Sequence, residues 1–334
     1  MTFYDVAIIG GGPAGLTAAA TLARQLHTAV VFDSQKYRNA NSHELHMVPS
    51  LEGKDPASFR REARGGITSR YATVEFQDVA VTKVQKKGDA HFVTTDTDGK
   101  AWRSRKLLLA VGSADVFPPI EGFAALWGSR IFHCLFCKGY EDRGARSAGV
   151  LAVAPVPLPA DMLVAVAVHA AANAAQLVDA AGGRVTLYAN GDKALAAGLK
   201  TAAKKQAGWT VEPRKIRRLV AAKAEGEGGG EGGGESVVVG FEDGASRTEK
   251  FLVNQPLTVP GGPFVGQLGL TTSGLGDIQA DPTFHQTSVR GVFAAGDCMT
   301  PNKVVPTAIS TGCSAAVGVS TQLQSEKYGF KSVV

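Results

Sequence analysis

Cys134 and Cys137, two residues apart, are the side chains in this sequence best suited to reversible covalent chemistry. When the first turn of a helix holds a Cys-x-x-Cys pair, both sulfurs lie within bonding reach, and a small disulfide can close and reopen. The same position makes one thiol a good nucleophile, which thiol–disulfide exchange requires. The pair therefore predicts a redox-active disulfide at the start of a helix.

A zinc site and a pair of core cysteines are the alternative interpretations. A structural zinc site needs four ligands, and the sequence has neither a second Cys-x-x-Cys pair nor a His-x3-5-His pair, so no metal site is expected. The two other cysteines, Cys298 and Cys313, each stand alone among small apolar residues. We expect both to be buried fillers.

His133 directly precedes the cysteine pair. An imidazole titrates near neutrality and can take a proton from a thiol, so His133 is the candidate general base. A histidine that only packs or caps is the alternative. The candidate catalytic residues are thus Cys134, Cys137 and His133.

The totals describe an ordinary globular protein. The chain has 334 residues, of which 44% are hydrophobic and 19% charged, and this length suits two or three domains. The net charge of +5 is mild, and the basic run at residues 214–218 lacks the interleaved aromatics of a nucleic-acid site. Polar residues interrupt the apolar stretch at 162–181, which favours a buried helix over a membrane span. With no signal peptide and few cysteines, we expect a cytoplasmic protein without nucleic-acid or membrane partners.

A glycine-rich turn near the start of the chain is the first element that indicates a binding site. Gly10, Gly12 and Gly15 occupy the positions of the G-x-G-x-x-G motif. Gly10 allows a tight turn, Gly12 lets the backbone approach a pyrophosphate, and Gly15 lets helix and strand pack closely. Asp33 ends the next strand, where an acid binds a ribose hydroxyl. The strand–helix–strand order is expected over residues 4–10, 16–26 and 29–33. Dinucleotide binding is predicted, and a glycine-rich turn of another α/β protein is the alternative.

A second strand–helix–strand unit follows the cysteine pair. Its elements are expected over residues 148–153, 159–181 and 184–189. The turn at 154–159 has three prolines and no glycine, so it offers few N–H groups to a phosphate. No arginine cluster for a 2′-phosphate follows at 190–193. The unit therefore predicts a Rossmann-like fold without the means to bind NADPH.

Two boundaries divide the chain. A proline-rich hinge at 116–122 marks the first, and the chain is expected to return to the first domain near 248–253. We therefore expect one discontinuous domain over residues 1–115 and 248–334, and a second over residues 116–247.

The second domain also contains an expected hairpin. Residues 215–222 and 236–241 have strand character, and the Gly/Glu tract at 225–235 between them predicts a flexible loop.

With these pieces in order, the sequence resembles the low-molecular-weight thioredoxin reductase family of flavoproteins over nearly its whole length. Residues 10–15 with Asp33 match the family's motif for the ADP part of FAD, and residues 291–297 match its second FAD motif. Cys134 and Cys137 fall between the domains, where that family keeps its redox disulfide. The resemblance implies an α/β fold of two Rossmann-like, three-layer domains, the FAD domain being discontinuous.

Within the family the chain looks like a fungal branch of FAD-dependent dithiol oxidases, which close the disulfide of epidithiodiketopiperazine toxins such as gliotoxin and holomycin. The segments that match this branch are residues 32–39, 133–142 and 306–313. Thioredoxin reductases have an acid directly after the second cysteine, whereas this chain has Lys138. The lack of a recognisable NADPH-binding turn at 154–159 agrees with this difference from the thioredoxin reductases.

This resemblance implies FAD as the cofactor, a small-molecule dithiol as the substrate, O2 as the electron acceptor with H2O2 as product, and a homodimer. The dithiol would attack Cys134, and Cys137 would lie nearer the flavin. Leu135, Phe136 and Trp127 could then form an apolar wall for a small cyclic peptide, although core packing explains them equally well. The residues assigned to FAD are Gly10, Gly12, Pro13, Ala14, Gly15, Asp33, Gly112, Gly296, Asp297, Thr307 and Ala308. The rival interpretations are an NADPH-dependent thioredoxin reductase and a flavoprotein that sequesters a dithiol without turnover.

Overall fold

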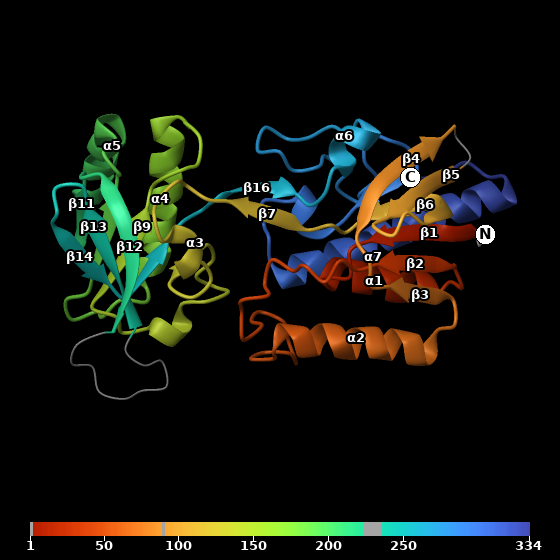
Figure 1. Ribbon diagram of the computed structural model, residues 1–334, viewed down its shortest axis with the longest axis horizontal. Helices are drawn as coiled ribbons and strands as arrows, with labels where there is room; N and C mark the ends of the chain where they lie inside the picture. Colours follow the sequence, from red (N-terminus) through yellow and green to blue (C-terminus); the bar gives the residue numbers. More distant parts are fainter. Residues whose placement is uncertain (1–2, 89–90, 224–234) are drawn as a thin grey trace. The chain divides into compact units, whose positions relative to one another are not determined.

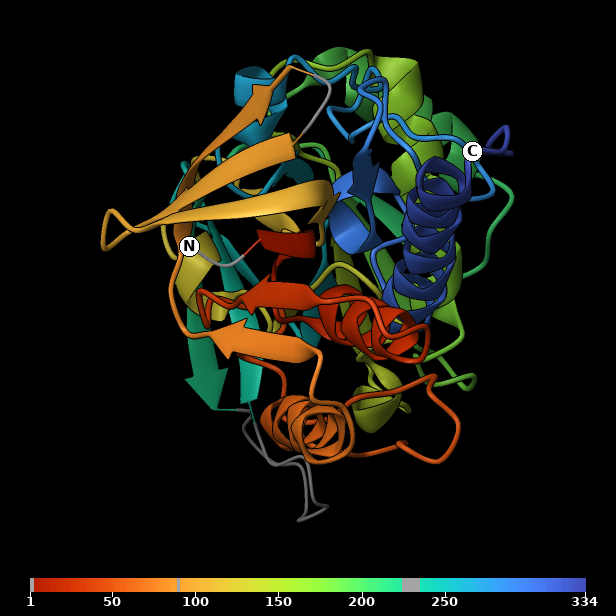
Figure 2. The same ribbon diagram turned by 90° about the vertical axis from the view of Figure 1, so that its right-hand side faces the viewer.

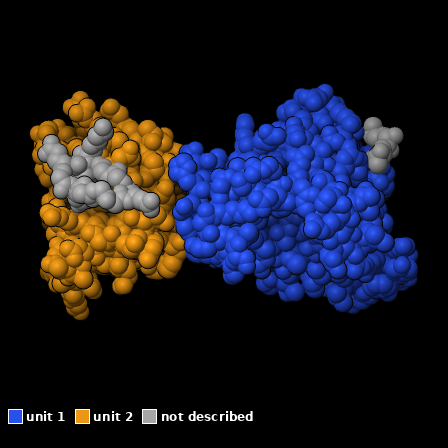
Figure 3. All heavy atoms as spheres, turned by 90° about the horizontal axis from the view of Figure 1, so that it is seen from below, with its two compact units in different colours: residues 1–114, 258–334 blue, residues 115–257 orange. Residues whose placement is uncertain are grey.

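The computed structural model describes residues 3–88, 91–223 and 235–334, and the chain divides into two compact units (Figures 1 and 3). Unit 1 comprises Met1–Ala114 and Thr258–Val334, and unit 2 comprises Asp115–Leu257. The loop expected at 225–235 lies outside the described residues, apart from Glu235.

Unit 1 is built on a seven-stranded sheet with the order β3-β2-β1-β6-β5-β4, in which β17 also pairs with β6. The strands are β1 (Phe3–Ile9), β2 (Ala29–Phe32), β3 (Val74–Gln77), β4 (Val81–Lys87), β5 (His91–Asp96), β6 (Ala101–Leu109) and β17 (Val292–Ala294). Strands β1, β2, β3, β6 and β17 run parallel, so their carboxyl ends lie along one edge of the sheet. The apolar runs of β1 and β2 suit strands that are covered on both faces.

Two long helices, α1 (Pro13–Ala23) and α7 (Val305–Tyr328), pack together on one face of this sheet (Figures 1 and 2). Small residues allow their close approach, since a Cβ on Gly312 of α7 would lie 2.3 Å from the carbonyl oxygen of Ala14 in α1. Helix α2 (Pro56–Arg70) joins the same core through Ile67. The other face, to which Phe92 of β5 belongs, packs against Phe264 of the short helix α6 (Phe264–Leu268).

Unit 2 contains a five-stranded sheet of parallel strands in the order β11-β10-β9-β15-β8. Its strands are β8 (Ile131–Phe132), β9 (Ser147–Leu151), β10 (Arg184–Tyr188), β11 (Trp209–Glu212) and β15 (Phe251–Val253). Helices α4 (Ala160–Ala175) and α5 (Lys193–Ala203) cover one face. The other face packs against α3 (Phe123–Leu126) and an antiparallel sheet of β12 (Ile216–Lys223), β13 (Glu235–Phe241) and β14 (Ser246–Glu249). Unit 2 is therefore a three-layer unit (Figure 1).

The expected α/β class with two Rossmann-like units is confirmed, but one boundary needs correction. The chain returns to unit 1 at Thr258, not near 248. The reason is that β14 pairs with β13, and the apolar β15 inserts between β9 and β8 of unit 2. The two segments at which the chain crosses between units, β7 (Ser113–Val116) and β16 (Leu257–Pro260), form a two-stranded sheet.

The apolar stretch at 162–181 is also shorter as a helix than expected. Helix α4 ends at Ala175, and the chain then turns towards β10 through Gly182 and Gly183. Within the described part of the chain, no helix combines the length and apolarity that a membrane crossing requires.

Candidate active site

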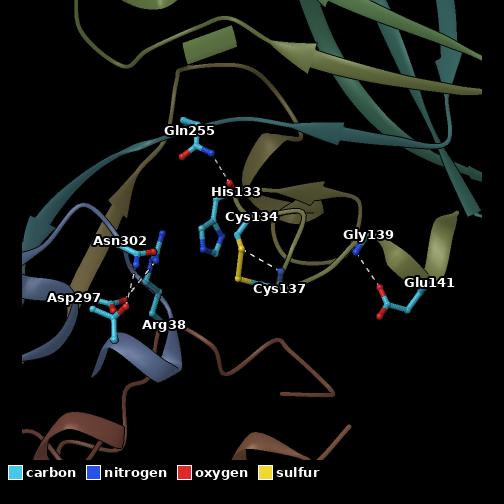
Figure 4. The surroundings of a disulfide bond; sticks show 10 residues. Arg38, His133, Cys134, Cys137, Gly139, Glu141, Gln255, Asp297 and Asn302 are labelled. Atoms are coloured by element: carbon cyan, nitrogen blue, oxygen red, sulfur yellow. Dashed lines mark hydrogen bonds and ion pairs between the residues drawn. A yellow bond between two sulfur atoms is a disulfide. The ribbon is translucent and has the colours of Figure 1, made fainter. Parts of the chain in front are cut away.

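The cysteine pair forms a disulfide on the loop that follows β8 (Figure 4). The Cα atoms of Cys134 and Cys137 are 5.3 Å apart, a distance that suits such a bond. The N–H of Lys138 donates to the carbonyl oxygen of Cys134 at 3.1 Å, which closes one helical turn. The turn stops at Gly139, whose φ of +142° no helix contains. The expected helix is thus corrected to a single α-turn.

Packing is a second reason why position 139 requires a glycine. A Cβ at this position would lie 2.9 Å from Cδ1 of Leu177 and 3.0 Å from Cδ2 of Leu135. The loop therefore lies directly against the apolar core of unit 2, in which Leu135 and Leu177 take part.

The turn places a hydrogen-bond donor on one sulfur. The backbone N–H of Cys137 donates to Sγ of Cys134 at 3.1 Å. Such a donor stabilises negative charge on the sulfur once the bond is reduced. The geometry thus favours Cys134 as a sulfur that can leave as a thiolate.

His133 is held at both its backbone and its ring. The side-chain amide of Gln255 donates to the carbonyl oxygen of His133 at 2.6 Å. The imidazole stacks on the indole of Trp127, with ring centroids 5.9 Å apart and an interplanar angle of 28°. In Figure 4 the imidazole and the disulfide extend from the loop in the same direction. The structure thus places the imidazole of His133 beside the disulfide of Cys134 and Cys137.

An ion pair closes the base of this loop. Nη1 of Arg130, directly before β8, donates to both carboxylate oxygens of Asp142 at 3.0 and 3.2 Å. Asp142 ends the 3-10 helix η1 (Tyr140–Asp142) that follows Gly139. Both charged side chains are largely buried.

In unit 1 the glycine-rich turn follows β1, at the carboxyl edge of the sheet. Gly10 has a φ of +119°, and a Cβ there would lie 2.0 Å from the carbonyl oxygen of Ala110. A Cβ on Gly15 would lie 1.9 Å from the carbonyl oxygen of Gly10. A Cβ on Gly12 would instead have no described atom within 4 Å. Gly10 and Gly15 therefore serve the fold, whereas Gly12 leaves room for a ligand at the N-terminus of α1, which begins with Pro13 and Ala14.

The sequence reasoning missed Gly11. A Cβ there would lie 2.2 Å from Oδ2 of Asp33, so the absence of a side chain makes room for this carboxylate. Asp33 accepts hydrogen bonds from the N–H of Gln35 at 2.9 Å and the hydroxyl of Tyr37 at 2.5 Å. Burial and the bond to Asp33 raise the pKa of Tyr37, whose ring also packs under the Arg60 guanidinium at 3.7 Å. Asp33 is thus held beside the glycine turn.

The second glycine motif meets the first between the two helices. Gly296, with a φ of +78°, donates its N–H to Oγ1 of Thr311 at 2.9 Å. A Cβ on Gly296 would lie 3.0 Å from Cβ of Ala14 and 3.7 Å from Cβ of Ala308. The structure therefore brings Ala14, Gly296 and Ala308 together.

Asp297 lies in the 3-10 helix η2 (Gly296–Met299), which several bonds hold in place. Its carbonyl oxygen accepts from the hydroxyl of Ser113 at 2.8 Å and from Nζ of Lys303 at 2.6 Å. The same Nζ forms a buried ion pair with Asp277 at 2.6 Å. The Asp297 carboxylate lies 3.5 Å from Nη1 of Arg38 (Figure 4).

The remaining predicted positions occupy the same unit. Thr307 lies in the first turn of α7, where its hydroxyl accepts from Nδ2 of Asn302 at 3.0 Å. Gly112 follows β6 with a φ of +64°, and its carbonyl oxygen accepts from the N–H of Gly261 at 3.0 Å.

The residues of unit 1 fit a dinucleotide cofactor. The two glycine motifs and Asp33 follow the carboxyl ends of β1, β2 and β17, which is where ligands bind in parallel α/β sheets. Two helix N-termini stand at this edge and favour anionic groups. The open space at Gly12 would let a pyrophosphate approach the backbone there.

The corresponding edge of unit 2 has a different character. The first turn of α4 contains Asp161, a carboxylate that would repel a phosphate at this N-terminus. Nδ2 of the buried Asn254, which follows β15, donates to the carbonyl oxygens of Leu151 at 2.8 Å and Val153 at 3.0 Å. The amide therefore ties β15 to the end of β9, at the edge where a nucleotide would bind.

Two further expectations need comment. Cys298 is buried as expected, and burial raises the pKa of its thiol to about 12. Cys313 is exposed, contrary to expectation. It follows Gly312, which faces α1, and the next residue of a helix is rotated by about 100° away from that contact. The ring of Trp127 stacks on His133 rather than standing free as a wall.

The fold and site together define a flavin-dependent disulfide oxidoreductase. The chain belongs to the pyridine nucleotide-disulphide oxidoreductase family, whose model matches residues 4–312. Thioredoxin reductase tcpT of Claviceps purpurea is 42% identical, over 98% of this chain and 97% of its own length. Thioredoxin reductase sirT of Leptosphaeria maculans is 38% identical, over 96% and 94%. These matches confirm the resemblance to fungal thioredoxin reductase-like enzymes and, with it, FAD as the cofactor.

Solved structures agree with this assignment. HlmI has a TM-score of 0.78 at 27% identity, over 98% of this chain and 94% of that one. An oxidoreductase from Agrobacterium tumefaciens has a TM-score of 0.79 at 29% identity, over 97% and 99%.

Proposed function

We propose that this enzyme oxidises a small-molecule dithiol to an intramolecular disulfide and reduces O2 to H2O2. The dithiol would belong to the biosynthesis of, or self-protection against, an epidithiodiketopiperazine-type metabolite. The resemblance of residues 133–142 and 306–313 to the fungal dithiol oxidases supports this substrate class.

The observation that carries the proposal is the edge of unit 2 at which NADPH would bind. Asp161 places a negative charge at the N-terminus of α4, directly after a turn with three prolines. Asn254 ties the ends of β9 and β15 together at this edge. Because these features oppose a nicotinamide nucleotide, the electrons are supplied by the dithiol itself.

The reaction begins with an attack on the disulfide. One substrate thiol, deprotonated as it reacts, forms a bond to Sγ of Cys134 and breaks the Cys134–Cys137 bond. The electron pair of that bond remains on Sγ of Cys137, and the substrate is held as a mixed disulfide. The backbone N–H of Cys137, 3.1 Å from Sγ of Cys134, would then stabilise the Cys134 thiolate when it leaves in the next step.

The second substrate thiol completes the exchange. It attacks the substrate sulfur of the mixed disulfide, closes the substrate's own disulfide and releases Cys134 as a thiolate. The enzyme has then gained two electrons and two protons. The chemistry that FAD supplies when bound is the transfer of this electron pair to O2, so that one dithiol and one O2 give one disulfide and one H2O2.

His133 is the proposed general base for both attacks, because its imidazole adjoins Cys134 and an imidazole can accept a proton from a thiol. Replacing His133 by Gln is expected to slow dithiol oxidation and leave the FAD content unchanged. Full activity in that variant would remove His133 from the mechanism.

An aerobic assay against a panel of reduced epidithiol compounds, with H2O2 detection, tests the proposal. We expect one H2O2 per disulfide formed with at least one member of the panel, and none from Cys134→Ser. The absence of peroxide with the whole panel would favour a flavoprotein that sequesters a dithiol.

Relatives that are named thioredoxin reductases suggest a second candidate, an NADPH-dependent thioredoxin reductase. Anaerobic mixing with NADPH separates the two, because a reductase bleaches the flavin absorbance at once. We expect the absorbance to persist with NADPH and to fall with the epidithiol substrate. The resemblance also leads us to propose a homodimer, which light scattering measures.

A further inference from the structure

A stack of aromatic rings in unit 2 ends on His133. The ring centroids of Phe117 and Phe123 are 5.2 Å apart, and those of Phe117 and Trp127 are 5.0 Å apart. Phe123 and Trp127 stack at 5.8 Å with an angle of 21°. Trp127 in turn stacks on the His133 imidazole at 5.9 Å and 28°. Phe123 is fully buried, so the stack rests on the core of the unit.

The chain around Trp127 is itself well held. Trp127 follows α3, and its backbone N–H donates to the carbonyl oxygen of Ala124. Gly128 turns the chain with a φ of +78° and donates its N–H to Ile131 at 3.0 Å. These bonds fix the backbone from which the indole extends, in the short segment that leads into β8 and His133.

The backbone of His133 is fixed from the neighbouring strand. The backbone N–H of Asn254 donates to the carbonyl oxygen of Phe132 at 3.0 Å. The side-chain amide of Gln255 donates to the backbone carbonyl oxygen of His133 at 2.6 Å. The bond to its carbonyl oxygen fixes the backbone of His133, and the inclined contact with the indole, at 5.9 Å and 28°, limits how far the imidazole can turn. A general base depends on such an orientation, because proton transfer requires close and aligned atoms.

We propose that Trp127 is the positioning residue that orients the His133 imidazole for proton transfer at the cysteine pair. This inference rests on the proposed role of His133 as general base. Trp127 touches neither reacting sulfur in this role and acts through the histidine. Its removal would leave the base in place but let its ring turn, which slows the reaction without abolishing it.

The test measures the first exchange step directly. The FAD-loaded oxidised enzyme is mixed anaerobically with a large excess of dithiothreitol, and the reaction is stopped by alkylation at timed intervals. Mass spectrometry then gives the fraction of Cys134 and Cys137 that has been reduced. This readout requires neither the natural substrate nor turnover of the flavin.

We expect Trp127→Leu to slow the exchange on the order of tenfold, since small misplacements of a catalytic group have effects of that size or larger. Trp127→Phe, which retains a stacking ring, should restore most of the rate. In the His133→Gln background, Trp127→Leu should cause no further loss, because a residue that acts through the histidine has no effect once the histidine is gone. Phe117→Leu, which removes a ring from the same stack, is the matched packing control and should react like the wild type.

Two different results would overturn the inference, and they are distinguishable. If His133→Gln reacts as fast as the wild type, the base role fails and the positioning role fails with it. If His133→Gln is slow but Trp127→Leu is not, or if the two effects multiply in the double variant, the base role stands and the positioning role alone is wrong. FAD content and the unfolding midpoint verify that each variant is folded. If Trp127→Leu does not fold, Trp127→Met is used in its place.

Discussion

Arg130 and Asp142 join the two ends of the redox loop through a buried ion pair, with one guanidinium nitrogen 3.0 and 3.2 Å from the two carboxylate oxygens. The loop between them contains β8, His133 and the disulfide. A buried charge is costly unless it is paired, and removal of Arg130 would leave the buried Asp142 carboxylate without this counter-charge, whereas Arg130 also has a longer contact to Glu235 at 3.7 Å. The pair therefore fixes where the redox loop begins and ends.

The first prediction concerns this pair. Asp142→Asn keeps the size of the side chain but leaves the Arg130 guanidinium with only the exposed Glu235 carboxylate, 3.7 Å from Nε, as a counter-charge. We expect the free energy of unfolding to fall by about 3–5 kcal/mol, as is typical when one partner of a buried pair is removed. Denaturant unfolding followed by fluorescence measures this change.

An exposed pair in the same unit provides the control. Lys215 and Glu242 lie 2.8 Å apart, and more than half of each side chain is exposed. Glu242→Gln should change the free energy of unfolding by about 0–1 kcal/mol. Equal effects of the two substitutions would show that the Arg130–Asp142 pair has no special structural role.

The second prediction separates two glycines of one motif. Gly15→Ala places a Cβ 1.9 Å from a backbone oxygen, so the apoprotein should be destabilised. Gly12 has an extended backbone with a φ of −78° and open space for a Cβ. Gly12→Ala should therefore leave the stability of the apoprotein unchanged and weaken FAD binding by tenfold or more, on the order of 1.4 kcal/mol.

Two measurements check this contrast. Thermal unfolding of the FAD-free proteins reports stability, and quenching of flavin fluorescence on titration reports affinity. A Gly12→Ala protein that binds FAD like the wild type would exclude this glycine from the pyrophosphate cradle.

The third prediction concerns acid stability. A hydrogen bond with His27, opposed by partial burial, lowers the pKa of Asp5 to about 2, and bonds from Thr28 act in the same direction. Because the pKa is lower in the folded state than in the unfolded state, the ionised carboxylate stabilises the fold above about pH 4. This contribution is lost as the pH falls from about 4 towards 2.

Asp5→Asn removes that contribution. We expect it to cost on the order of 1–2 kcal/mol near pH 7, reduced by the partial exposure of the side chain, and almost nothing at pH 2. Denaturant midpoints of the two proteins across this range should converge as the pH falls. A constant difference between them at every pH would contradict the assigned cause.

The fourth prediction concerns the thiols. In the oxidised native protein, iodoacetamide at pH 8 should label Cys313 and leave Cys298 unmodified. Cys298 is fully buried, and its pKa of about 12 leaves almost no thiolate. Reduction of the disulfide should add labels at Cys134 and Cys137, and peptide mass spectrometry identifies each site. Rapid labelling of native Cys298 would be incompatible with its burial.

Much of the fold was predictable because its signals are local. The spacing of Gly10, Gly12 and Gly15 indicates a strand–turn–helix without any knowledge of the rest of the chain. The boundary near 248 was placed too early because a three-residue apolar strand such as β15 has no local feature that tells which sheet it enters.

The partners within the site were harder to predict, because they depend on contacts between distant segments. Gly11 makes room for Asp33, and Gln255 holds His133 from a neighbouring strand. Neither residue has a spacing that marks it. The exposure of Cys313 depends on the side of α7 that meets α1, which the small residues of that helix leave ambiguous in the sequence.

The amide of Asn254 has a consequence for how the protein depends on its cofactor. By mass action, a ligand that binds only the folded state stabilises the part of the chain that holds it, in proportion to the logarithm of its concentration. The edge of unit 1 that we assign to FAD would gain from that linkage. At the equivalent edge of unit 2, hydrogen bonds from the Asn254 side chain join β15 to the end of β9 without a ligand. Depletion of flavin in the cell would accordingly weaken unit 1 first, while the unit that carries the redox loop keeps its fold.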